Sequence, residues 1–184
     1  MAALRKTQVW LAAVVMAAGL GFLAPGPAAA DSYCGLAWGS LVKTDPAMSQ
    51  AKVANIRTGQ HYCFDRLVID LNGPVAGYTA RYVPQLMQDG SGLPVQLRGQ
   101  AFLQLTANAP AYDDNGQSTY NPADKNELTN VTGYQTFRQV AWAGSFEGYS
   151  SLGLGVRARL PFRVFTLAGS DTGSRLVIDV AHFW

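Results

Sequence analysis

The feature that most constrains the fold is a six-residue pattern that occurs twice, at residues 66–71 and 175–180. Each copy reads Arg-Leu-Val-Ile-Asp and ends on Leu or Val, so an apolar side chain recurs at every second position. This alternation is typical of a β-strand that buries one face. We therefore predict two strands that turn their second, fourth and sixth residues toward a core and their Arg, Val and Asp residues outward.

Two interpretations of the repeat remain open. Ordinary strands of a β-sandwich have the same pattern, so the two copies need not be related. Alternatively, the chain has internal pseudo-symmetry. Each equivalent strand then places an Arg and an Asp on the outer face, where opposite charges can pair across a sheet.

The rest of the chain also predicts short strands separated by turns rich in Gly and Pro. The strands are expected at residues 53–58, 62–72, 78–83, 95–107, 137–146, 152–160, 162–167 and 175–183. This pattern predicts an all-β fold, a β-sandwich of short antiparallel strands. Residues 108–130 form a long polar loop, and the sequence leaves open whether it is a functional loop or a variable insertion.

Residues 1–30 have the three parts of a signal peptide. Arg5 and Lys6 precede an apolar run at residues 9–24, and the segment ends on Ala28-Ala29-Ala30. This order of a charged, an apolar and a small-residue region predicts export and cleavage after Ala30. We therefore expect a protein that is secreted or associated with the cell wall, without membrane attachment after cleavage.

The two cysteines, Cys34 and Cys63, both follow the predicted cleavage point. An exported chain with two cysteines most often joins them in a disulfide, which would fasten an N-terminal arm at residues 31–52 onto a sandwich domain at residues 53–184. Lipidation of Cys34 would require small and apolar residues directly before it, and Asp31, Ser32 and Tyr33 stand there instead. Metal binding by the two thiols is a weaker alternative because the chain has two histidines.

The charge balance argues against nucleic acid as a partner. The chain has 14 basic and 12 acidic residues and a net charge of +2. Arg5 and Lys6 account for this excess, so the segment after residue 30 is neutral. Binding to nucleic acid requires a basic face.

No catalytic motif is recognisable in the sequence. His182 continues the inward-facing series of the second repeat and is interpreted as a core residue, whereas His61 lies beside a turn. Residues 144–148 miss the spacing of a nucleophile elbow, and residues 111–122 lack the first and last ligands of a calcium loop. We expect no enzyme activity, no cofactor and no metal. A hydrolase that uses two carboxylates and a β-barrel carrier of a small ligand remain the alternatives.

A basic strip near two aromatic residues, Phe146 and Tyr149, is the candidate binding site. Arg157 and Arg159 are predicted to share the outward face of one strand, with Arg163, Tyr149 and Glu147 nearby. The simpler interpretation is an ordinary solvated strand face. The functional interpretation is a surface for acidic groups of a cell-wall polymer or of a partner protein.

Several short segments, in this order, resemble the AMIN-like domain family of exported actinobacterial proteins. They are residues 64–71, 77–78, 82–83, 89–92, 146–148, 153–155, 161–165 and 175–182. AMIN domains proper are β-sandwiches that help to localise cell-wall amidases and secretins by binding peptidoglycan. The resemblance implies a non-catalytic envelope module whose partner is cell-wall glycan or an envelope protein. It assigns no binding residues to this chain.

Overall fold

The two copies of the repeat lie side by side as neighbouring antiparallel strands. The first copy lies in β3 (Phe64–Asn72) and the second in β11 (Ser174–Ala181). The register places Val68 opposite Val177, and it places the Arg of each copy opposite the Asp of the other. The two strands are therefore related by a local two-fold axis, and the Arg66 Nε donates to Asp179 Oδ1 over 2.6 Å. The predicted cross-strand pairing of charges is confirmed for Arg66 and Asp179.

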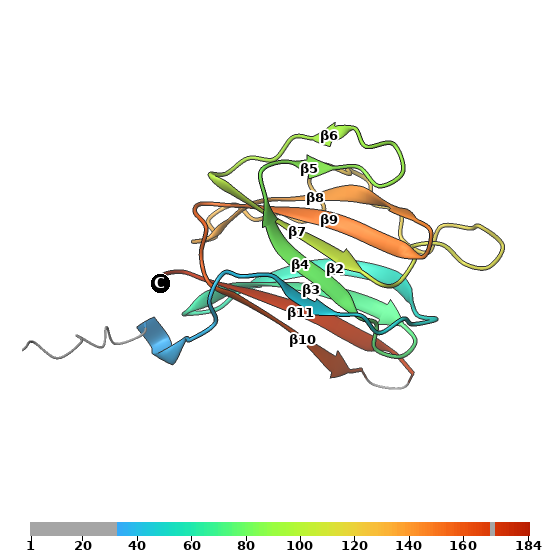
Figure 1. Cartoon of the computed structure of the whole chain (residues 1–184), viewed down its shortest axis with the longest axis horizontal. Coiled ribbons are helices and arrows are strands. Elements are labelled where there is room, and N and C mark those ends of the chain that lie inside the picture. The colour runs from blue at the N-terminus through green and yellow to red at the C-terminus, as the bar shows by residue number, and fades with distance from the viewer. Residues whose placement is uncertain (1–32, 170–171) are drawn as a thin grey trace, which may run out of the picture. The chain divides into compact units, whose positions relative to one another are not determined.

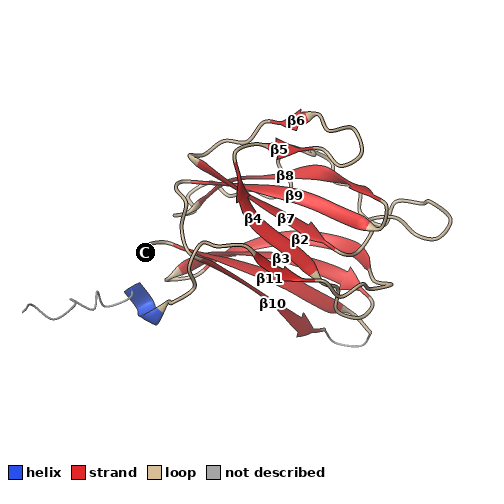
Figure 2. Ribbon diagram, viewed as in Figure 1, coloured by secondary structure: helices blue, strands red, loops and turns tan. Residues whose placement is uncertain are grey.

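The structure, a computed structural model, describes residues 33–169 and 172–184 (Figure 1). The predicted signal peptide at residues 1–30 lies outside the described residues. Apart from a short 3-10 turn, η1 (Tyr33–Gly35), the described elements are strands (Figure 2). Besides β3 and β11 they are β1 (Lys43–Asp45), β2 (Lys52–Gln60), β4 (Tyr78–Val83), β5 (Leu86–Met87), β6 (Pro94–Val95), β7 (Ala101–Ala107), β8 (Phe137–Phe146), β9 (Tyr149–Val156) and β10 (Phe162–Ala168). No helix in this part of the chain is long and apolar enough to cross a membrane.

Two sheets face each other, as the all-β sandwich prediction requires (Figure 1). Sheet A has the strand order β1-β4-β7-β9-β8, and sheet B has the order β10-β11-β3-β2. In sheet B each repeat strand has its own hairpin partner on the outside, so the pseudo-symmetry extends over two hairpins. Both sheets are open, so the closed sheet that a barrel carrier requires is absent from the described residues.

The core between the sheets is built from the alternating positions that the sequence predicts. The fully buried members include Leu67, Ile69, Leu103, Leu105, Leu152, Leu154, Leu176 and Ile178. Val68 and Val177 point to the outer face as predicted, yet both are buried. This outer face is therefore not a plain solvated surface.

Two differences between the predicted and observed strands affect the candidate sites. The expected strand at residues 152–160 ends at Val156, so Arg157 and Arg159 are not on a strand. The expected strand at residues 95–107 is interrupted at residues 96–100. Gly99 lies at this interruption with φ of 127°, a conformation that only glycine adopts readily.

The long polar loop protects an edge of sheet A. Strand β8 is the last strand of that sheet, and an unprotected edge can pair with other chains. Trp142 N donates to Lys125 O over 2.7 Å, and Leu128 N donates to Val140 O over 2.9 Å. Residues 125–128 therefore follow β8 almost as an additional strand.

The N-terminal arm is fastened by the predicted disulfide between Cys34 and Cys63. Beyond it, Gly39 O accepts a hydrogen bond from Phe162 N, and β1 pairs with β4. The arm thus contacts both sheets.

Candidate functional site

Small residues on the outer face of sheet A create the platform on which the site is built. Gly153 and Gly155 of β9 lie on this face, and the β5–β6 hairpin packs on it with Leu86. A Cβ at Gly153 would overlap the Leu86 side chain, and one at Gly155 would overlap Arg98 O. Only glycine lets the chain approach β9 this closely.

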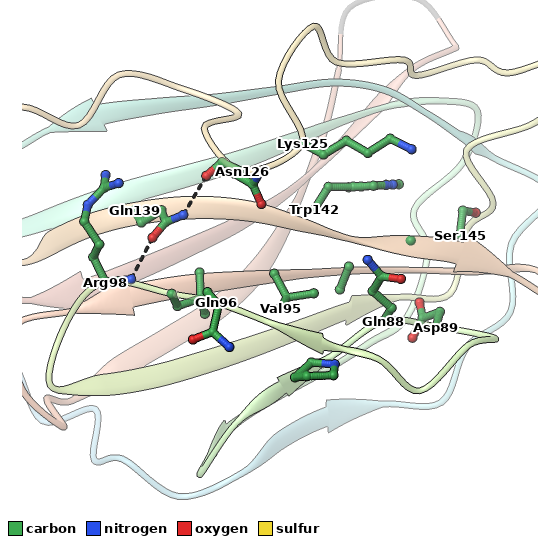
Figure 3. A pocket seen from close by; sticks show the side chains of 14 residues that line it. Gln88, Asp89, Val95, Gln96, Arg98, Lys125, Asn126, Gln139, Trp142 and Ser145 are labelled. Atoms are coloured by element: carbon green, nitrogen blue, oxygen red, sulfur yellow. Dashed lines mark hydrogen bonds between the residues drawn. The ribbon is translucent and has the colours of Figure 1, made fainter.

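An open cleft of about 730 Å³ lies between residues 88–98 and the long loop (Figure 3). Lys125 and Trp142 line one side, and Gln88 and Gln96 line the other. Trp142 is mostly buried and packs with the core, so the β8 side of the cleft has an apolar backing. An apolar backing with a few polar groups around it is the usual composition of a ligand site.

Gln139 joins the two walls at one end of the cleft. Its Oε1 accepts from Arg98 N over 2.6 Å, and its Nε2 donates to Asn126 O over 2.8 Å (Figure 3). Gln139 is 4% exposed, so both bonds are shielded from water. The two walls therefore keep a fixed spacing, as a preformed binding site requires.

The two ends of the cleft differ in charge. At the Gln139 end, the Arg98 guanidinium forms an ion pair with Glu127. The hydrogen bond within this pair raises the pKa of Arg98. At the other end lies Asp89, whose Oδ2 is buried and has no hydrogen-bond partner among the described residues. Burial raises the pKa of Asp89 and outweighs the opposing effect of hydrogen bonding with Ser151.

The described lining of the cleft combines several amide side chains with a single carboxylate. Asp89 is the one carboxylate among the described residues that line it. Amide side chains such as Gln88, Gln96 and Asn126 present both donors and acceptors. No group of three or more His, Cys, Asp or Glu suited to a metal occurs in residues 33–169 and 172–184.

A sequence model of the AMIN-like domain matches residues 51–182, which include all the strands from β2 to β11. The chain belongs to the AMIN-like domain family. Comparisons with curated proteins and with solved structures give no match. Membership of this family indicates an envelope-associated module.

The five binding residues predicted from the sequence fall into two groups in the AMIN-like domain. Tyr149 begins β9 and Glu147 lies in the turn before it, whereas Arg157 follows the last residue of β9. At about 3.3 Å per residue, the strand separates the groups by roughly 25 Å. The structure therefore does not gather them into one strip.

The three arginines are held by the protein itself. The Arg157 guanidinium donates to His182 O, and Arg159 Nη2 donates to Ser40 O over 3.1 Å. Arg163 donates to the buried Asp179 over 2.8 Å. Their role in binding remains a prediction.

Sequence reasoning missed the cleft of the AMIN-like domain. Its residues come from three separate segments, and Gln88, Lys125 and Gln139 match no motif. A usable signal was the pair of glycines at alternate positions of one strand, Gly153 and Gly155, because strand glycines mark the close approach of another chain segment.

Replacing Gly155 tests whether this close approach supports the cleft. We expect Gly155→Ala to lower the free energy of unfolding by about 2–3 kcal/mol, because the new Cβ forces Arg98 O away from β9. Gly59→Ala is the matched control: it is also a strand glycine, but its Cβ would meet no atom closer than 4.0 Å. Urea unfolding of both variants measures the difference, and equal midpoints would contradict the prediction.

Proposed function

We propose that this AMIN-like domain is a secreted, non-catalytic cell-envelope module that binds peptidoglycan glycan. The binding site is the cleft between residues 88–98 and the long loop, which we call the β8 cleft. The observation that carries the proposal is the cleft itself, with an aromatic residue on one side and amide-rich walls at fixed spacing. Sugars present an apolar ring face and many hydroxyls. An indole edge can pack on the face, and amides can match hydroxyls that donate and accept.

Family membership and the predicted signal peptide support the same location. AMIN domains associate with the cell wall, and the resemblance therefore implies a cell-wall partner for this chain. A hydrolase that uses two carboxylates is less favoured, because such an enzyme holds both at a fixed separation and the described lining supplies Asp89 alone.

Co-sedimentation of the purified protein with isolated peptidoglycan tests the proposal. A Gln88→Ala/Lys125→Ala variant removes two exposed groups from opposite walls and leaves Gln139 and the core intact. We expect wild-type protein to pellet and this variant to bind about tenfold more weakly, equivalent to about 1.4 kcal/mol. An Arg157→Ala/Arg159→Ala variant, matched in the number of changes, is expected to pellet like wild type.

The other outcomes assign the site differently. Loss of pelleting in the arginine variant alone, with unfolding midpoint unchanged, would place the site at the arginines predicted from sequence. Absence of pelleting by wild type at both low and moderate salt would reject glycan binding and leave an envelope protein as the partner.

A further inference from the structure

The outer face of sheet B is rich in arginine, and two aspartates partly balance the charge. The side chains concerned are Arg57, Arg66, Asp70, Arg163, Arg175 and Asp179. The two-fold relation of the repeat predicts two equivalent ion pairs on this face, one at each end of the β3–β11 pair.

Only one of the two equivalent ion pairs forms. Arg66 bonds Asp179, but the equivalent Asp70 bonds Arg57 of β2 instead, with Nε to Oδ2 at 2.8 Å and Nη2 to Oδ1 at 3.0 Å. Arg175 lies opposite Asp70 in the register, yet its guanidinium turns to Ala168 O over 3.1 Å. The Arg175 Nε is buried and has no hydrogen-bond partner in the described part of the chain.

This guanidinium lines a basin of about 250 Å³ on the outer face. Arg57, Thr58, His61 and Arg66 also contribute polar groups to the lining, and Val68 and Val177 contribute the buried apolar floor. No carboxylate occurs among the described lining residues. A concave site with three arginines and an apolar floor strengthens attraction for an anion, because water screens the charges less there.

Aromatic rings fix two of the polar side chains that line the basin, Arg66 and His61. Arg66 lies over the rings of Phe64 and Phe165, with 5.1 Å and 5.5 Å from its Cζ to the ring centroids. His61 stacks on Phe64 at 4.6 Å between centroids. Side chains held in this way lose little conformational entropy when a ligand binds.

We propose that this basin is an oxyanion site that binds a phosphate or carboxylate group, with the Arg175 guanidinium as its central donor. The planar guanidinium can match either group with two parallel N–H bonds, and its Nε has no partner among the described residues that binding would displace. The site lies on sheet B, whereas the β8 cleft lies on sheet A. It is therefore a second binding surface that stands whether or not the cleft binds glycan.

The test is an NMR titration of the purified protein that follows the arginine Nε–H resonances at constant ionic strength. Inorganic phosphate is added in one arm and acetate in the other. We expect the Arg175 resonance to shift with saturation at millimolar anion, and Arg175→Gln to weaken binding about tenfold. Arg81→Gln on sheet A is the matched control because it removes the same charge from an exposed strand position, and it is expected to bind like wild type.

A variant that is expected to raise the anion affinity, rather than lower it, strengthens the test. Asp70→Asn removes the carboxylate that holds Arg57, so we expect anion binding to tighten by a factor of about three. Preference for phosphate would assign the site to phosphate-containing polymers, and preference for acetate would assign it to carboxylates. An unmoved Arg175 resonance in both arms, or equal weakening by Arg81→Gln, would overturn the proposal.

Discussion

Asp65→Ala is expected to lower the free energy of unfolding by about 3–5 kcal/mol, the usual cost of removing one partner of a buried polar pair. Asp65 is fully buried, and its Oδ2 accepts from Thr136 N over 2.6 Å and from Phe137 N over 3.0 Å. Its Oδ1 lies 3.1 Å from Nε2 of the buried His182. The substitution would leave three buried groups without their partner.

The location of these bonds explains why the effect should be global. Asp65 belongs to β3 of sheet B, and Phe137 begins β8 of sheet A, so one carboxylate joins the two sheets. His182 follows β11, and its main-chain N donates to Cys63 O. Domains of this size are stable by about 5–15 kcal/mol, so the loss is a large fraction of the total.

Urea unfolding followed by far-UV circular dichroism measures the change as a lower midpoint with an unchanged slope. Asp114→Ala is the matched control, because its side chain is 92% exposed and its ion pair with Lys52 lies on the surface. We expect the control to cost at most about 0.5 kcal/mol. Equal losses in the two variants would show that Asp65 does not hold the sheets together.

The sequence predicts this pair only in part. Asp65 occupies the same alternating positions as Leu67, Ile69 and Leu71, and His182 continues the series that ends at Val180. Periodicity thus indicates that both side chains face inward. It cannot indicate that they meet, because their proximity depends on the pairing of two strands that are far apart in the chain.

The same limit separates the fold from the candidate site. Alternation, turns and the repeat are local signals, and they were sufficient for the all-β sandwich, the core face and the adjacent charges of the repeat. The cleft depends on main-chain hydrogen bonds between residues 125–128 and β8. Residues of almost any type can form such bonds, so the sequence does not reveal them. Likewise, the choice of Asp70 between Arg57 and Arg175 depends on side-chain geometry within the assembled sheet.

Removal of the disulfide is expected to cost about 3–4 kcal/mol of stability. The bond between Cys34 and Cys63 closes a loop of sequence separation 29, and the chain-entropy model gives this magnitude for loops of that length. The effect arises mainly in the unfolded chain, which gains conformational freedom once the loop opens. In the folded protein the arm retains other anchors, among them the bond from Phe162 N to Gly39 O.

Urea unfolding measures this contribution. It is carried out on wild-type protein and on a Cys34→Ala/Cys63→Ala variant, each with and without a reductant. We expect the variant to be insensitive to the reductant and reduced wild type to approach the variant's midpoint. Pelleting with peptidoglycan under folding conditions should not change, because the residues that line the cleft lie between positions 88 and 145. Loss of pelleting in a folded variant would instead show that the disulfide-linked end of the arm takes part in binding, since the cleft keeps its own hydrogen bonds without the disulfide.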